Sequence, residues 1–236
     1  MVVVTGAAGG LGSAVCTVLE REGATVVGVD LHGEVTLTAD VGTENGARSM
    51  IDETVRAYGR LDALVLNAGV QHMAPIDEFP LEEWDRVLSV LLRGPFIAIK
   101  RAWPHLKASS AGRIVVTASA SSFVAEAYKS AYVAAKHGVA GLVKVVAIEG
   151  APFGITANAV APGLMLTPLI ENQIADQQRL HGVQREEVLA RFLARGPADR
   201  AVETTEVAEV IAFLLCERAS GVNGAVVPVD LGLLAC

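Results

Sequence analysis

Two side chains capable of proton transfer lie four residues apart in the stretch SAYVAAKHG, residues 130–138. In a helix this spacing is about one turn, so the phenol of Tyr132 and the ammonium of Lys136 leave the same face. Tyrosine has an ordinary pKa near 10 and is a poor base at neutral pH, but a nearby ammonium favours the phenolate. The pair is therefore a candidate general acid–base site. Without other motifs it would rather indicate a surface pair on an amphipathic helix.

A glycine-rich turn, TGAAGGLG at residues 5–12, directly follows the apolar run VVVT and opens a helical pattern. Gly6 permits a sharp turn, while Gly10 and Gly12, on either side of Leu11, let the backbone approach a phosphate closely. The position after the first predicted strand favours a dinucleotide-binding turn over an ordinary glycine-rich turn.

Asp30 ends the second predicted strand, where a carboxylate can accept hydrogen bonds from an adenosine ribose and would repel a 2′-phosphate. No Arg or Lys follows nearby to reverse that preference. The sequence therefore predicts NAD rather than NADP as the cofactor. The alternative is that Asp30 is a solvated loop residue.

Short β-branched runs alternate with longer helical patterns along the chain. Most runs are continuously apolar, as expected for strands covered on both faces. The alternation predicts an α/β fold: a Rossmann-type, doubly wound parallel sheet of about seven strands, in one domain over residues 1–236. Between the second and third strands only a bare loop, DLHGE, is available for the crossover. Strands are predicted at 2–5, 25–29, 35–38, 63–67, 113–118, 155–160 and 225–229, and helices at 10–22, 43–58, 81–105, 130–149, 168–195 and 204–217.

Composition excludes several classes of function. The net charge is −7 and no Lys/Arg cluster is present, which argues against nucleic-acid binding. Three widely spaced cysteines without a CxxC motif favour a reducing compartment and argue against a disulfide framework or a metal site. Residues 1–19 carry no charged side chain. Their four glycines, and the absence of Lys or Arg at the beginning of the run, indicate a strand and a turn rather than a targeting or membrane segment. A cytoplasmic protein that does not bind a membrane is expected.

Taken together, TGAAGGLG, LNAG at 66–69, Ser119 and YVAAK at 132–136 resemble the short-chain dehydrogenase/reductase family. The resemblance extends from Met1 to about Asp230. It implies a single Rossmann-type domain, a nicotinamide cofactor, and the oxidation of alcohols or reduction of carbonyls.

The resemblance also implies a role for individual residues. Tyr132 would donate and accept the proton, Lys136 would hold the nicotinamide ribose and lower the tyrosine pKa, and Ser119 would bind the reacting oxygen. The candidate cofactor-binding residues are Gly6, Gly10, Leu11, Gly12, Asp30, Asp40, Val41, Asn67, Ala68, Gly69, Tyr132, Lys136, Pro162, Gly163 and Thr167.

In motif detail the chain is most similar to 3-hydroxybutyrate dehydrogenases, through NAGVQHMAPIDEFP, YKSAYVAAKHGV and GITANAVAPG. This similarity implies that Gln71, Lys129 and Gln173 hold a substrate carboxylate, which suits a small hydroxy acid. Two simpler alternatives stay open: Lys129 as a solvated charge at a helix start, and Gln173 as a surface residue. The candidate substrate-binding residues are Gln71, Ser119, Lys129, Tyr132, Leu164 and Gln173.

Three positions at the proton relay or the substrate wall depart from that pattern. Leu91 replaces an asparagine that helps to hold a water for proton relay, Ser121 replaces a histidine at the substrate, and Leu164 replaces a tryptophan. A different, less polar carbonyl substrate is therefore a second hypothesis. An NAD(H)-binding protein with a weakened site, because of Leu91, is a third.

Two longer segments suggest how the site closes and how chains assemble. Residues 168–195 mix apolar and charged positions at helical spacing and are predicted to form a mobile lid, with a fixed pair of surface helices as the alternative. The helix at 130–149 is apolar nearly all round, which predicts burial on more than one side. One side would pack on the sheet and the other on a second copy, giving a homodimer or homotetramer.

Overall fold

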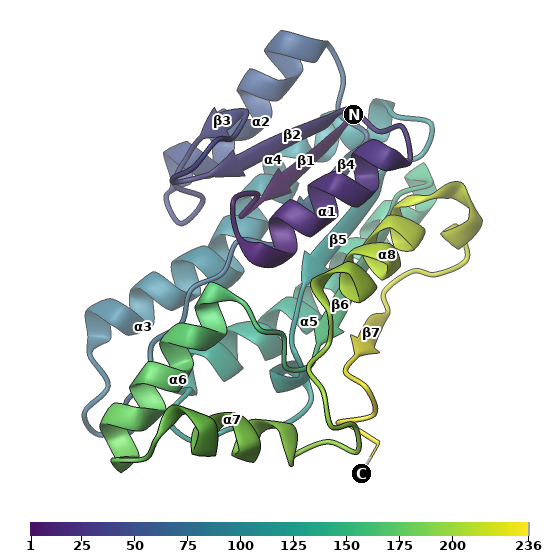
Figure 1. Ribbon diagram of the computed structural model, residues 1–236. Coiled ribbons are helices and arrows are strands. Elements are labelled where there is room, and N and C mark those ends of the chain that lie inside the picture. The colour runs from purple at the N-terminus through teal and green to yellow at the C-terminus, as the bar shows by residue number, and fades with distance from the viewer. Residues whose placement is uncertain (236) are drawn as a thin grey trace.

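The computed structural model describes residues 1–235, apart from the side chains of residues 180 and 181. Seven parallel strands form one sheet in the order β3-β2-β1-β4-β5-β6-β7 (Figure 1). The chain order reverses between β1 and β4, which creates a crevice at the carboxyl ends of these strands. The doubly wound sheet predicted from the sequence is confirmed. The strands are β1 (Val2–Thr5), β2 (Val26–Asp30), β3 (Leu37–Thr38), β4 (Ala63–Leu66), β5 (Arg113–Thr117), β6 (Thr156–Pro162) and β7 (Val226–Val229).

Helices cover both faces of the sheet (Figure 1). Successive side chains of a strand point to opposite faces, so Val3 joins one apolar core while Val2 and Val4 join the other. Helices α2, α4 and α5 close the first core, and α1 and α8 close the second. These helices are α1 (Gly10–Arg21), α2 (Glu44–Tyr58), α4 (Gly94–Ala108), α5 (Ser130–Gly150) and α8 (Thr204–Leu215), with short 3₁₀ turns at Ala120–Ser122, Ala151–Phe153 and Glu217–Ala219.

The single helix expected over residues 81–105 is interrupted. Helix α3 (Leu81–Leu88) leads into a π-helical turn, Ser89–Arg93, before α4 begins. The Gly94 N–H donates to the Ser89 carbonyl, five residues back, and Pro95 has no N–H to offer the Leu91 carbonyl. The proline therefore explains why the helical pattern does not continue unbroken.

The predicted helical segment 168–195 consists of two helices. Helix α6 (Pro168–His181) ends at Gly182, whose positive φ of 66° closes the helix in a left-handed conformation. Helix α7 (Arg185–Leu193) follows it and packs against it (Figure 1). The crossover from β2 to β3 is the bare loop that the sequence predicted.

Helix α5 packs on one face of the sheet, against β6. Together with the turn that follows it, α5 is long and apolar enough to cross a membrane, as core helices of other proteins also are. Val139, Val143 and Ala147 pack it into the first core. On another face, Val145 and Ile148 are 51% and 75% exposed.

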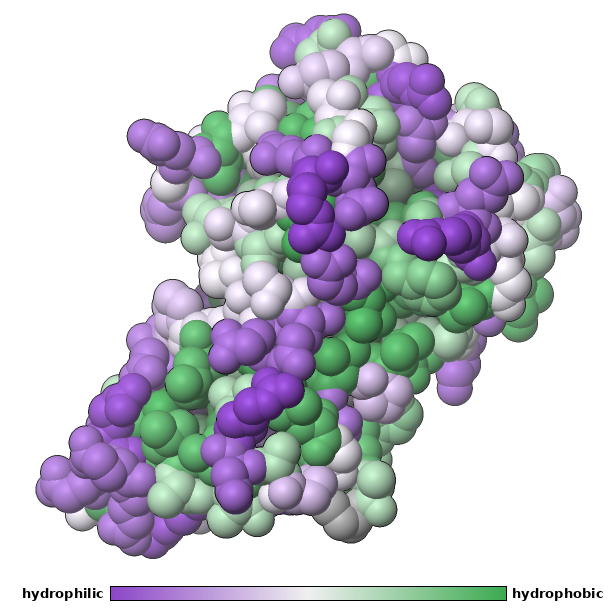
Figure 2. All heavy atoms as spheres, turned by 45° about the vertical axis from the view of Figure 1, so that its right-hand side comes forward, coloured by the Kyte–Doolittle hydropathy of each residue, from purple (hydrophilic) through white to green (hydrophobic). Residues whose placement is uncertain are grey.

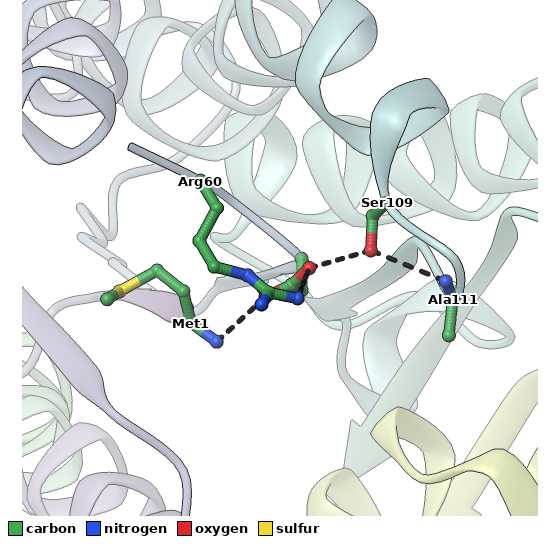
Figure 3. A network of polar contacts seen from close by, with 5 residues as sticks. Met1, Arg60, Ser109 and Ala111 are labelled. Carbon is green, nitrogen blue, oxygen red and sulfur yellow. Dashed lines mark hydrogen bonds and ion pairs between the residues drawn. The ribbon is translucent and has the colours of Figure 1, made fainter. Parts of the chain in front are cut away.

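Asp62 lies directly before β4, at the amino end of the sheet, and joins the segments of Met1, Arg60 and Ser109, which Figure 3 labels. Its carboxylate accepts hydrogen bonds from the Met1 amino group at 2.9 Å, the Arg60 guanidinium at 2.8 Å and the Ser109 hydroxyl at 2.7 Å. Burial would raise the pKa of Asp62, but these three donors outweigh it and hold the pKa well below its usual range.

We predict that Asp62→Asn lowers the free energy of unfolding at pH 7 by roughly 1–2 kcal/mol, because hydrogen bonds to a charged acceptor are lost. An acid whose folded-state pKa is depressed stabilises the fold above its unfolded pKa of about 4, and this stabilisation is lost as the pH falls further. The difference between variant and parent should therefore shrink on acidification, in urea titrations at pH 7 and pH 3. Asp52→Asn, which breaks an exposed pair with Arg101, is the control.

Candidate active site

One cavity of about 780 Å³ lies between the carboxyl ends of the central strands and α6. Every residue predicted above as catalytic, cofactor-binding or substrate-binding lines this cavity. The fold thus brings together segments from β1 to α6 that are far apart in the sequence. The local geometry differs from one end of the cavity to the other.

The glycine-rich turn between β1 and α1 has no room for a side chain at Gly6 or Gly12. A Cβ on Gly12 would lie 1.9 Å from the Gly6 carbonyl oxygen, and Gly6 itself has a φ of +69°. A Cβ on Gly10 would meet the Thr167 side chain at 3.2 Å. The first turn of α1 carries no acidic residue, and no side chain caps it. Its N–H groups and positive dipole end therefore suit a phosphate group.

The end of the cavity near β2 is lined by two polar side chains, Asp30 and Asn67. The Asp30 carboxylate is held by the N–H groups of Ala8 at 3.0 Å and Leu31 at 2.7 Å, and it faces the cavity. The Asn67 side chain donates to the Thr5 carbonyl at 3.1 Å and accepts from the Thr117 hydroxyl at 3.1 Å. Asn67 thereby ties the ends of three strands together, which explains why an amide stands at this position.

Ser119, Tyr132 and Lys136 meet at the middle of the cavity. The Ser119 hydroxyl accepts from the Ser121 N–H at 3.1 Å and is hydrogen-bonded to Tyr132. The Lys136 Nζ lies 5.5 Å from the centre of the Tyr132 ring and donates to the Thr117 carbonyl at 2.5 Å. The spacing of four residues on α5 therefore does place the phenol and the ammonium together.

The expected lowering of the tyrosine pKa by Lys136 is not found. Burial raises the pKa of Tyr132, the hydrogen bond from Ser119 opposes this, and the charge of Glu126 adds to it. Burial also lowers the pKa of Lys136 to about 8. The groups of the protein therefore keep the phenol protonated at neutral pH.

Gln71, Gln173 and Lys129 form a hydrogen-bonded chain at the far end of the cavity. The Lys129 Nζ donates to the Gln173 Oε1 at 2.8 Å, and the Gln173 Nε2 donates to the Gln71 Oε1 at 2.7 Å. Lys129 is only 5% exposed, so it is not a solvated helix-start charge, and Gln173 is buried rather than a surface residue. Within the described residues, the buried Gln71 Nε2 has no acceptor. A ligand with a hydrogen-bond acceptor would satisfy this buried donor.

Two charged residues of this end were not predicted from the sequence. The Glu126 Oε1 lies 2.9 Å from the Lys129 Nζ and 3.0 Å from an Arg195 nitrogen. Glu126 belongs to the loop before α5, and Arg195 follows α7. Burial would raise the pKa of Glu126, but the two cations outweigh it and lower the pKa. Glu126 stands three residues before Lys129, which was the only local signal, and nothing near Arg195 marks it.

The three positions that depart from the family pattern lie at or behind the wall of the cavity. Ser121 and Leu164 line the cavity. The Leu91 side chain is 2% exposed and lies in an apolar cluster with Val87, Ala131 and Ala135. It cannot hold a water, and its surroundings are apolar.

We predict that Leu91→Asn lowers the free energy of unfolding by about 2–4 kcal/mol, because a buried amide loses its hydrogen bonds to water and the apolar packing is reduced. Leu91→Met, which conserves volume, should cost less than about 1.5 kcal/mol. Thermal or urea unfolding of both variants measures this. If the asparagine also raises kcat, then the proton relay of the parent is impaired; an unchanged or lower kcat means that the protein uses another path.

Comparison with known proteins gives consistent matches over the whole chain. The family model described as enoyl-(acyl carrier protein) reductase matches residues 6–234. A D-beta-hydroxybutyrate dehydrogenase of Rhizobium meliloti is 38% identical, over 99% of this chain and 98% of that protein. The oxidoreductase YxjF of Bacillus subtilis is 41% identical, over 99% and 97%. The crystal structure of levodione reductase superposes with a TM-score of 0.94 at 34% identity, over 100% of this chain and 97% of that one.

Proposed function

Because the chain belongs to the short-chain dehydrogenase/reductase family, which acts on CH–OH and C=O groups, we propose that it is an NAD-dependent dehydrogenase for a small hydroxy acid resembling 3-hydroxybutyrate. The observation that carries the proposal is the donor chain of Gln71, Gln173 and Lys129 in the same cavity as Tyr132. Lys129 precedes Tyr132 by three residues, about one helical turn. A carboxylate held there keeps a neighbouring hydroxyl near the phenol.

Within the group Ser119, Tyr132 and Lys136, some residues orient the reactants and one transfers the proton. The Ser121 N–H holds the Ser119 oxygen and so orients its hydroxyl group, whose proton turns from Tyr132 to the reacting oxygen when a substrate is bound. Tyr132 takes the proton of the substrate hydroxyl, or returns it in the reverse direction. When bound, the nicotinamide ring supplies the hydride chemistry. Lys136, buried beside Tyr132, would hold the ribose of the cofactor through its ammonium protons.

The glycine turn and Asp30 fit NAD better than NADP. We predict that Asp30→Ala lowers the ratio of kcat/KM with NAD to kcat/KM with NADP by at least about tenfold, since a charged hydrogen-bond acceptor is lost and a repulsion of the 2′-phosphate is removed. Steady-state kinetics with both cofactors measures the ratio. Glu34→Ala, in the exposed loop after β2 but outside the cavity lining, is the matched control and should leave it unchanged.

A less polar ketone or alcohol is the second candidate, favoured by Glu126. Its carboxylate offsets the charge of Lys129, and Leu164 adds apolar surface to the cavity. The likeness to levodione reductase supports the same alternative. The test is an assay of purified protein with NAD⁺ against 3-hydroxybutyrate, other hydroxy acids and neutral secondary alcohols. Turnover of neutral alcohols alone would favour the second candidate, and NADH binding without turnover would favour a binding protein with a weakened site.

We further propose that the protein is a homodimer or homotetramer. The exposed Val145 and Ile148 leave one face of α5 without an apolar partner in the described chain. Figure 2, which brings the side of α8 and β7 forward, shows a second gathering of apolar surface, and Phe213 of α8 is 45% exposed. Two such faces suit two kinds of contact between copies. Light scattering on a sizing column tests this, and a clean monomer would contradict it.

A further inference from the structure

The charged residues at the substrate end converge on a single atom. The Glu126 Oε1 lies within 3.0 Å of both the Lys129 Nζ and an Arg195 guanidinium nitrogen. Other charged side chains that line this end and are described are paired elsewhere: Arg86 with Glu83 at 2.6 Å, and Asp176 with Arg179 at 2.9 Å. Two cations and one anion therefore remain, which leaves a net charge of +1.

We infer that Glu126 and Arg195 set the substrate charge that this pocket selects. The inference rests on the proposed function and deepens it. Lys129 and Glu126 alone would form a neutral pair with little preference for an anion. Arg195, contributed by the segment after α7, restores one positive charge, so a single carboxylate makes the cluster neutral. The unpartnered Gln71 Nε2 in the same cavity gives that carboxylate a further donor.

A charge balance differs in its effects from an ion pair that only fastens the segment after α7 to the loop before α5. A fastening would depend on the contact itself, so that removal of either partner, or of both, would have the same result. A charge balance depends only on the sum. Loss of Arg195 lowers the sum to zero, loss of Glu126 raises it to +2, and loss of both returns it to +1 through Lys129.

The test uses calorimetry to measure how tightly butyrate and its uncharged amide, butyramide, bind to the protein saturated with NADH. For the parent we expect butyrate to bind more tightly than butyramide. Arg195→Gln should lower the affinity for butyrate roughly tenfold relative to the affinity for butyramide. Glu126→Gln should raise this relative affinity by a similar factor. The double variant should regain the parent preference. Arg191→Gln removes an exposed arginine of α7 that pairs with Glu187, and it should leave the preference unchanged.

Two outcomes would overturn the inference. In the first, the double variant prefers butyrate over butyramide no more than Arg195→Gln does. In the second, Arg195→Gln does not reduce the preference of the parent for butyrate. Failure of the proposed function is a different result. The binding pattern can hold in a protein that does not oxidise 3-hydroxybutyrate, and 3-hydroxybutyrate can be oxidised by a protein whose double variant shows no recovery.

Discussion

Replacement of Tyr132 by phenylalanine is expected to lower kcat roughly 10²–10⁴-fold, which is the usual contribution of a positioned general acid–base group. The ring of Tyr132 packs beside α3 and the π-helical turn, and phenylalanine keeps that packing. Only the hydroxyl, with its hydrogen bond to Ser119, is removed. Binding of NADH should therefore change little, and steady-state rates together with NADH fluorescence titration measure both quantities.

A matched control is Tyr58→Phe, which removes the hydroxyl of an exposed tyrosine at the end of α2. It should leave kcat unchanged. A Tyr132→Phe variant that retains most of the parent turnover would show that another group transfers the proton.

A substitution in the glycine-rich turn is expected to have the second large effect, on the binding of NAD. Gly12→Ala places a Cβ 1.9 Å from the Gly6 carbonyl oxygen and 2.9 Å from the Ala7 Cα, so the backbone of the turn must move. Because a phosphate site depends on the positions of these N–H groups, we expect binding of NAD to weaken at least about a hundredfold, well beyond the tenfold step of about 1.4 kcal/mol. Calorimetry with NAD⁺ measures the loss.

The control for this variant is Gly221→Ala, at a glycine with an ordinary φ and no atom within 4 Å of the added Cβ. It should bind NAD like the parent. Circular dichroism of Gly12→Ala separates a damaged turn from an unfolded chain. Normal NAD binding by a folded Gly12→Ala protein would contradict the assignment of this turn to the pyrophosphate.

The sheet and the motifs at the centre of the cavity could be predicted because they depend on local patterns. Continuous apolar runs mark strands covered on both faces, and the glycine turn and the Tyr132–Lys136 spacing are contiguous in the sequence. The interruption between α3 and α4 could have been predicted from Pro95, which lies in the interior of the segment 81–105 and has no N–H for the helical hydrogen bond.

The electrostatics of the site could not be predicted. The raised pKa of Tyr132 depends on its burial, which no local pattern reports. The contact between Glu126 and Arg195 joins a loop before α5 to the end of α7, and only the folded chain brings them together. The residues that hold the substrate were therefore predictable by resemblance, whereas the charge that they present required the structure.

The most direct test of the proposed function follows the hydride itself. The protein is incubated with NAD⁺ and 3-hydroxybutyrate that carries deuterium on the carbon bearing the hydroxyl, and the reduced cofactor is analysed by NMR. We predict that the deuterium appears at C4 of the nicotinamide ring and that Tyr132→Phe slows its appearance. A parent protein that forms no labelled cofactor from this hydroxy acid would contradict the account.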